Sequence, residues 1–179
     1  VHYPYVFVHG MGGWGADEGI NDLIPYWGAT TGALMPKLRE NGYECYDASV
    51  GPISSCWDRA CELYAQMVGD TVDYGEAHAK AHNHARYGRT YTTPLFDGWG
   101  KSEKNGVIKK VNLVGHSFGG NTIRQSCLQT AMKQNGKLRL LRSYPRFSRG
   151  ARPTGCIPSP PSARPTMARR CATLPMNLS

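Results

Sequence analysis

The stretch Val111-Asn-Leu-Val-Gly-His-Ser-Phe-Gly-Gly120 decides the fold of this 179-residue chain. Its first four residues form an apolar run typical of a buried strand, and the residues after it are compatible with a helix. Between them, Gly115-His-Ser-Phe-Gly119 fits the pattern Gly-x-Ser-x-Gly. A strand that turns straight into a helix holds the serine in strained backbone angles, and side chains two residues away on either side would collide. The pattern therefore predicts that Ser117 is a nucleophile.

Two backbone N–H groups are expected to stabilise the negative charge that develops when such a serine attacks a carbonyl. The helix after Ser117 would point its N-terminal amides at that charge, which makes the N–H of Phe118 one candidate. The second candidate is the N–H of Met11, in the glycine-rich loop that follows the strand-like run Tyr5-Val-Phe-Val8. The alternative is that these glycines only permit a tight turn.

The remaining elements alternate along the chain. Strands are expected over residues 5–8, 43–48 and 107–114, and helices over residues 30–41, 54–69 and 122–132. Residues 70–106 are polar and rich in His, Tyr and Gly, with no clean helix or strand across their length, so they are interpreted as an insertion. This alternation predicts an α/β fold with a mainly parallel sheet flanked by helices.

The charge of the chain is divided by position. Residues 1–103 contain every acidic residue and have a net charge of −6, whereas residues 104–179 contain none and have a net charge of +14. The last part is also rich in Pro, Arg and Ser without a periodic apolar pattern, which is typical of disorder. We therefore expect a domain over residues 1–133 and a disordered or frame-shifted basic tail over residues 134–179. An arm that binds nucleic acid or another acidic surface is the alternative for the tail.

The composition also bears on membrane insertion, secretion and disulfide bonding. No apolar run approaches the roughly 20 residues of a transmembrane helix, and no signal peptide is visible before the first strand-like run. The six cysteines have no C-x-x-C pair and no regular spacing, so unpaired thiols are the preferred interpretation over a disulfide framework.

Four segments in order resemble one family: Val8-His-Gly-Met-Gly-Gly-Trp-Gly15, Val50-Gly-Pro-Ile-Ser-Ser-Cys-Trp-Asp-Arg-Ala60, Gly69-Asp-Thr-Val-Asp-Tyr-Gly75 and His82-Asn-His-Ala-Arg-Tyr-Gly-Arg-Thr90. They are similar to the bacterial lipases of the thermophilic bacillus and staphylococcal group, over about residues 3–124. The resemblance implies an α/β-hydrolase fold and a secreted triacylglycerol lipase that cleaves lipid or other ester substrates at an oil-water interface. It also implies a helical lid, a structural zinc in the insertion and a calcium further along.

Matched to the motifs of this family, the zinc ligands in this chain are Asp58, His78 and His84. Spacing alone would favour His78 with His82, because residues four apart share one face of a helix. The family's fourth zinc ligand is a later Asp that has no counterpart here, because no Asp, Glu or His follows residue 116. The calcium site of the full-length family is likewise absent from this sequence.

The lack of Asp, Glu and His after residue 116 also affects catalysis. In this fold the serine is followed along the chain by an Asp or Glu and then by a His that accepts its proton. His9 and His116 lie beside the predicted site but are not placed to act as this base. The 179-residue chain is therefore expected to be inactive as it stands. The alternatives are another serine hydrolase, such as an acyltransferase or thioesterase, and a non-catalytic, zinc-stabilised binding module.

Overall fold

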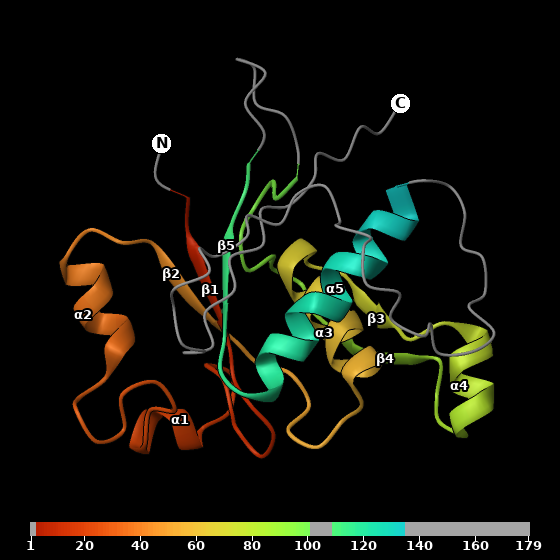
Figure 1. Cartoon of the computed structure of the whole chain (residues 1–179), viewed down its shortest axis with the longest axis horizontal. Helices are drawn as coiled ribbons and strands as arrows, with labels where there is room; N and C mark the ends of the chain where they lie inside the picture. The colour runs from red at the N-terminus through yellow and green to blue at the C-terminus, as the bar shows by residue number, and fades with distance from the viewer. Residues whose placement is uncertain (1–2, 101–108, 135–179) are drawn as a thin grey trace, which may run out of the picture.

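The computed structural model describes residues 3–100 and 109–134 (Figure 1). Its elements are β1 (Tyr5–Val8), α1 (Ile20–Leu23), α2 (Leu34–Glu40), β2 (Cys45–Ala48), α3 (Cys56–Val68), β3 (Thr71–Asp73), α4 (Glu76–His82), β4 (Tyr87–Thr90), β5 (Asn112–Gly115) and α5 (Phe118–Gln134). The expected tail after residue 134, the end of the expected insertion and the start of the strand expected over residues 107–114 lie outside the described residues.

A three-stranded parallel sheet forms the centre of the molecule, with β1 between β2 and β5. Val8, the last residue of β1, is aligned with Ala48 of β2 and with Gly115 of β5. This arrangement confirms the expected α/β class and the parallel sheet. Because the three strands run in the same direction, the loops that follow them all leave from one edge of the sheet.

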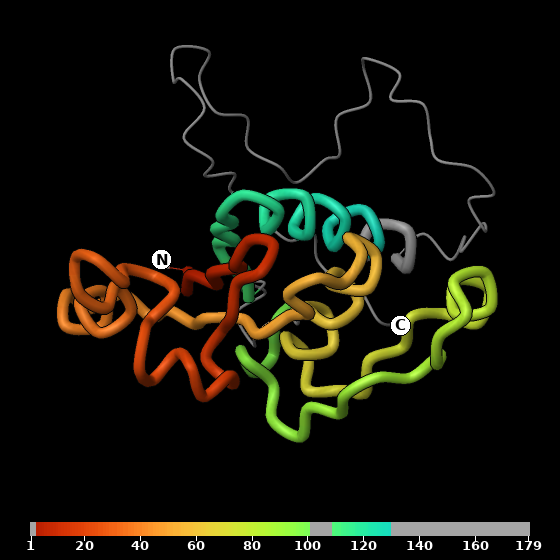
Figure 2. Tube along the Cα trace, turned by 90° about the horizontal axis from the view of Figure 1, so that it is seen from below, coloured from red at the N-terminus to blue at the C-terminus, as the bar shows by residue number. Residues whose placement is uncertain are grey.

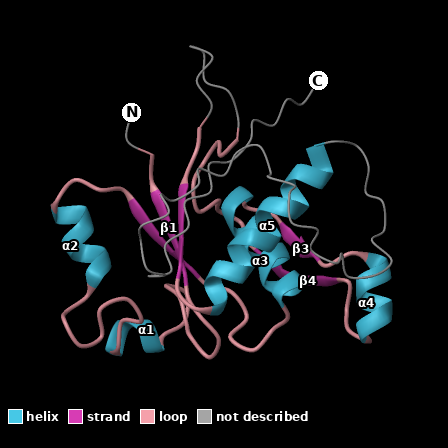
Figure 3. Cartoon of the chain, in the orientation of Figure 1, coloured by secondary structure: helices cyan, strands magenta, loops and turns pink. Residues whose placement is uncertain are grey.

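Alternating residues of the strands face opposite helical layers. Val6, Val8 and Leu113 pack on one side in a core that also contains Leu63 of α3 and Ile123 of α5. On the other side, a smaller core is formed by Phe7, Met35 and Cys45, with residues around α2 packed against it. Figure 3 shows the two layers, with α3 and α5 together on one side of the sheet. Full burial of each large apolar side chain stabilises the fold by roughly 1.5–3 kcal/mol.

The longest helix before the serine motif has clear end signals. The Ser55 side chain accepts a hydrogen bond from the N–H of Asp58 at 3.1 Å, which caps the N-terminus of α3. Gly69 ends the same helix with a φ of 72°, in the left-handed region that glycine adopts without steric cost. These caps agree with the helix expected over residues 54–69.

Three expectations about helices need correction. The helix expected over residues 30–41 begins only at Leu34, because Gly32 has a φ of 88° and keeps the preceding residues in turns. The helix after the serine begins at Phe118, not at Thr122. The short helix α1 was not expected at all, and four residues are too few to show an apolar period.

Residues 70–106, interpreted from the sequence as an insertion and called the insertion below, contain more regular structure in their described part than their composition suggested. Strands β3 and β4 form a two-stranded antiparallel sheet, and α4 lies between them in sequence. Val72 and Tyr91 of this region pack against Ala65 of α3, which gives the insertion a small apolar core. Figure 2 shows α4 and α2 at opposite ends of the molecule. The expectation that residues 70–106 lack a clean helix or strand is therefore wrong for the described part.

Two expectations drawn from composition can be checked in the described part of the chain. None of its helices combines the length and the apolar character needed to cross a membrane. Cys45, Cys56 and Cys61 form no disulfide, whereas Cys127 is disulfide-bonded. The interpretation of the cysteines as unpaired is therefore confirmed for the first three and wrong for Cys127.

Candidate active site and metal cluster

Ser117 lies at the turn between β5 and α5, at the edge of the sheet where the parallel strands end. It is exposed and has a φ of 52°. Among the described residues, Asn83 is the only other non-glycine with a positive φ. The turn is closed by a hydrogen bond from the N–H of Gly119 to the oxygen of His116 at 2.8 Å. The structure therefore places the serine in the strained conformation that the sequence pattern predicted.

Both glycines of the motif lie where a side chain would not fit. A Cβ on Gly115 would lie 2.6 Å from the backbone nitrogen of Gly120. A Cβ on Gly119 would meet the carbonyl oxygen of Val8 in strand β1 and would lie 2.7 Å from that of His9. These close backbone approaches are the physical reason for the small residues on either side of Ser117.

The glycine-rich loop after β1 lies against the serine turn. A Cβ on Gly10 would be 3.1 Å from the Ser117 Cβ. The loop is held by a hydrogen bond from the N–H of Gly12 to the oxygen of Pro52 at 2.8 Å. Within the described residues, neither the N–H of Met11 nor that of Phe118 donates to a protein acceptor. Neither of the two predicted donors is therefore occupied by a described protein acceptor.

Tyr26 joins the two loops from the side. Its hydroxyl accepts a hydrogen bond from the N–H of Gly10 at 2.9 Å and lies 2.6 Å from Nδ1 of His116. Its ring packs edge-to-face on Trp27 and His9. Tyr26 was not identified from the sequence, because no local pattern links it to residues 90 positions away.

The two histidines beside the serine have other partners. His9 is fully buried, and its Nδ1 lies 2.9 Å from the oxygen of Gly10 while its Nε2 accepts from the N–H of Val50 at 3.4 Å. Burial lowers the pKa of His9 below its usual 6.5. His116 is bonded to Tyr26 as described. Both imidazoles therefore have hydrogen-bond partners other than Ser117.

The neutral His9 predicts a pH dependence of stability. Because its pKa is lowered in the folded state, the unfolded chain binds more protons as the pH falls below about 6.5. The contribution of His9 to the free energy of unfolding should therefore fall between about pH 7 and pH 5, while that of Asp47, whose pKa burial raises to about 7, changes in the opposite direction over this range. Urea unfolding across this range would measure the slope, and a His9→Gln variant should show a smaller one. An equal slope in both proteins would contradict the assignment to His9.

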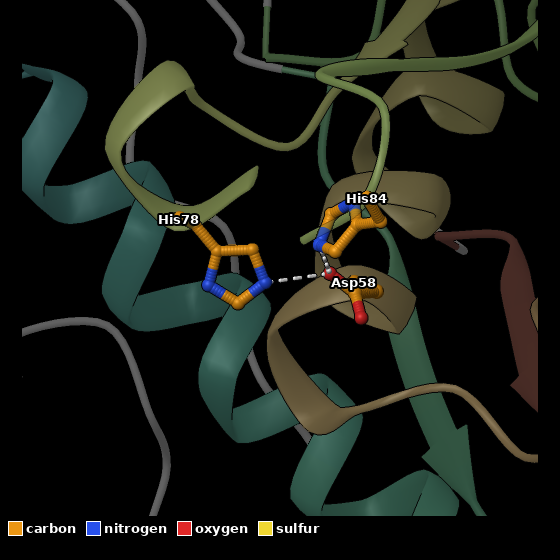
Figure 4. A group of neighbouring side chains, drawn as sticks. All are labelled: Asp58, His78 and His84. Atoms are coloured by element: carbon orange, nitrogen blue, oxygen red, sulfur yellow. Dashed lines mark hydrogen bonds and ion pairs between the residues drawn. The ribbon is translucent and has the colours of Figure 1, made fainter. Parts of the chain in front are cut away.

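A second cluster joins α3 to the insertion. His78 Nε2 lies 2.9 Å from Asp58 Oδ1, and His84 Nε2 lies 3.8 Å from the same oxygen. Figure 4 shows both rings directed at the Asp58 carboxylate, His78 from α4 and His84 from the segment after it. One ligand atom from each residue lies within 4.8 Å of the others. These are the three residues expected from the family resemblance.

The end of α4 explains why His84 joins the cluster and His82 does not. Asn83 has a φ of 55°, which ends the helix and reverses the chain. The next residue, His84, is thereby brought toward Asp58. His82 is not one of the clustered ligand residues, although its ring centroid lies 4.4 Å from that of His78. Helical spacing alone would thus have selected a histidine outside the cluster of Asp58, His78 and His84.

The amino-acid sequence of the chain matches one known protein family. A family model described as "Lipase-like, C-terminal domain" matches residues 1–138. The chain belongs to the lipase-like family. This confirms the resemblance found in the sequence motifs, and with it the assignment to a family of ester hydrolases.

The chain spans less than a fifth of the length of the staphylococcal lipases it matches. A lipase of Staphylococcus epidermidis is 46% identical over 122 residues, which are 68% of this chain and 17% of that protein. Lipase 1 of Staphylococcus aureus is 47% identical over the same length. Among solved structures, lipase 1 from Pelosinus fermentans has a TM-score of 0.65 at 48% identity, covering 72% of this chain and 32% of that one. Staphylococcus hyicus lipase has a TM-score of 0.60 at 37% identity, with 76% and 35% covered. The chain thus corresponds to a portion of a lipase.

Arg59 is the other residue of this lipase-like chain that sequence reasoning missed. It lies within the quoted motif Trp57-Asp-Arg-Ala60, in which only the Asp was given a role. The structure shows its side chain fully buried and bonded to the loops around Ser117. A cation on the inner face of an otherwise amphipathic helix was the available signal.

Proposed function

We propose that Ser117 is the nucleophile of a carboxylic ester hydrolase, and that the N–H groups of Met11 and Phe118 form its oxyanion hole. The observation that carries this proposal is the exposed serine at a positive φ between β5 and α5, with the Gly10 loop packed against it. The serine oxygen would attack the acyl carbon, and the two N–H groups would bind the oxygen on which negative charge develops.

We further propose that the substrate is a triacylglycerol or a related lipid ester presented at an oil-water interface. The relatives named as lipases support this class. The exposed apolar residues at this edge also support it, since Met11 is 65% exposed and Ile53, next to the Pro52 that holds the loop, is 85% exposed. We place the complete protein outside the cell, as the family resemblance implies.

A chimera tests this function. Residues 1–124 would be joined to the part of Pelosinus fermentans lipase 1 that follows its matching segment, which would supply the groups expected downstream of the serine. We expect this protein to hydrolyse p-nitrophenyl butyrate. The Ser117→Ala variant should lose about 10⁴-fold or more in kcat/KM, whereas Ser54→Ala, in the loop after β2, should keep most of the activity. A folded chimera without Ser117-dependent hydrolysis would refute the proposal.

We propose that Asp58, His78 and His84 bind a structural zinc ion. Imidazole nitrogens and a carboxylate oxygen suit Zn²⁺, and tetrahedral bonds of about 2.0–2.1 Å hold ligand atoms about 3.3 Å apart. The 2.9 and 3.8 Å distances to Asp58 Oδ1 lie on either side of this value, so small movements would accommodate the ion. The Trp57 ring stacks on His78, and Ser55 Oγ donates to Asp58 Oδ2 at 2.8 Å, which orients both ligands. When bound, the ion would link α3 to the insertion.

Zinc binding should stabilise the chain measurably. At a free Zn²⁺ concentration 100 times its dissociation constant, the free energy of unfolding should rise by about 2.7 kcal/mol. Thermal unfolding with and without zinc would detect the shift. The shift should disappear in His84→Ala and persist in His82→Ala, which serves as the matched control. Loss of the shift in His82→Ala, or its retention in His84→Ala, would show that the wrong histidine was chosen.

A further inference from the structure

The buried side chain of Arg59 connects three segments around the proposed site. It projects from α3 and is 0% exposed. Its Nη2 donates to the backbone oxygen of His9 at 2.5 Å, and its Nη1 donates to that of Gly51 at 2.6 Å. Its Nε donates to Oγ1 of Thr122, in the second turn of α5, at 3.0 Å. One guanidinium therefore joins the loop after β1, the loop after β2 and the helix that follows Ser117.

The charge of Arg59 makes this an expensive arrangement. Within the described residues it forms no ion pair with a carboxylate. The carboxylate of Glu62, one turn along α3, instead accepts from the N–H of Gly51 at 2.6 Å and from the hydroxyl of Tyr74 at 3.0 Å. Burial lowers the pKa of Arg59. Because an apolar side chain would fill the same space at lower cost, the stability of the fold alone does not account for an arginine here.

The carbonyl oxygens of His9 and Gly10 both face the Arg59 guanidinium, and that of Gly10 is also bonded to the His9 ring. The oxygen of Gly10 lies 3.4 Å from Arg59 Nη1 and 2.9 Å from His9 Nδ1. In a trans peptide the C=O and N–H point in opposite directions, and the described residues contain no cis peptide. The N–H of Met11 therefore points away from Arg59. The preceding peptide, between His9 and Gly10, has the same orientation. Its C=O accepts from Arg59, and its N–H donates to the Tyr26 hydroxyl.

The orientation of the Gly10–Met11 peptide is weakly restricted by the local backbone. Gly10 has no Cβ to restrict its backbone angles, so the Gly10–Met11 peptide can rotate more readily than its neighbours. Such a rotation would turn the carbonyl oxygen, in place of the Met11 N–H, toward the substrate. The same guanidinium lies over the ring of Phe118, with Cζ 5.4 Å from the ring centroid, and so contacts the residue that offers the other proposed donor.

We propose that Arg59 is a positioning residue that fixes the orientation of the Gly10–Met11 peptide, and with it the Met11 N–H, relative to Ser117. It acts through the backbone and does not touch substrate. Its relevance to catalysis rests on the proposed function of Ser117 and Met11.

Residue-resolved amide hydrogen exchange of the 179-residue chain tests this role. Arg59→Met removes the donors and keeps most of the side-chain length. We expect the exchange of the Gly10 and Gly12 amides to accelerate by about tenfold or more, with a smaller change in the strand amides of β1 and β2. Arg39→Met is the matched control, because Arg39 also donates to a backbone oxygen, that of Cys45 at 3.1 Å, but lies away from the serine turn. It should leave the Gly10 and Gly12 amides unchanged.

Two further variants test whether the effect on amide exchange comes from the hydrogen-bond geometry of Arg59, from its charge or from global unfolding. Arg59→Lys keeps the charge but lacks the planar fork, so it should resemble Arg59→Met. If neither folds, Thr122→Val decides. It removes the acceptor of Nε, together with the 3.3 Å bond from the Thr122 hydroxyl to the oxygen of Phe118 within α5, and should accelerate the Gly10 and Gly12 amides by about two- to fivefold. Unchanged loop amides, or an equal acceleration in strands and loop, would overturn the proposal. Ester hydrolysis is not part of this readout, so an inactive chimera would remove the proposed function without altering the exchange pattern.

Discussion

Gly119→Ala is expected to destabilise the chain by roughly 2–4 kcal/mol. The added methyl group would meet the carbonyl oxygen of Val8 and would lie 2.7 Å from that of His9. The Val8 oxygen already accepts from the N–H of His116 at 3.1 Å, so it cannot move away without breaking a contact between β1 and the serine turn. Urea unfolding followed by circular dichroism would measure the loss.

The neighbouring glycine provides the control. A Cβ on Gly120 would have no atom within 4 Å, and the residue lies inside α5. Because alanine is a better helix former than glycine, Gly120→Ala should be neutral or stabilising by up to about 1 kcal/mol. An equal change in stability for both variants would contradict the close packing of α5 against β1 at Gly119.

The purified 179-residue chain is expected to hydrolyse p-nitrophenyl butyrate at least about 10⁴-fold more slowly than a complete lipase of the family. The reason is that residues 118–179 contain no Asp, Glu or His, so nothing after the serine can accept its proton or orient a base. The two nearby imidazoles are bonded elsewhere, His9 to Gly10 and Val50 and His116 to Tyr26.

The control for this expectation is the serine itself. If the residual hydrolysis does not depend on the triad, Ser117→Ala should change the rate of the isolated chain only slightly. Hydrolysis at a rate comparable with that of a complete lipase, abolished by Ser117→Ala, would show that some other group accepts the proton. The exposed His116 would then be the first residue to replace.

Local signals in the sequence accounted for the central sheet and for the serine turn. The apolar runs at β1 and β5 and the glycines around Ser117 each reflect a requirement that is visible within a few residues. The boundaries of α3 were predictable for the same reason, because Ser55 and Gly69 are local cap residues. The metal cluster followed only from the family resemblance, since its geometry depends on the left-handed Asn83.

Features that depend on contacts between distant parts of the chain were not predictable. The secondary structure of the insertion is supported by packing of Val72 and Tyr91 on Ala65 of α3, and no apolar period within the insertion reveals it. Tyr26 and Arg59 are polar residues with no motif-based role, and only the folded chain brings them to the loops around Ser117. Tertiary contacts of this kind leave no periodic pattern in a single sequence.

The nucleophilicity of the Ser117 oxygen can be measured by its attack on an acyl-like centre in this chain. A fluorophosphonate is reactive enough to record slow attack over a long incubation, and tryptic peptide mapping would locate the adduct. We predict modification within the peptide of residues 111–124, which contains Ser117 as its single serine, and no modification of this peptide in Ser117→Ala. An unmodified peptide 111–124 in the folded chain, or adducts confined to other serines, would show that Ser117 is not the nucleophile.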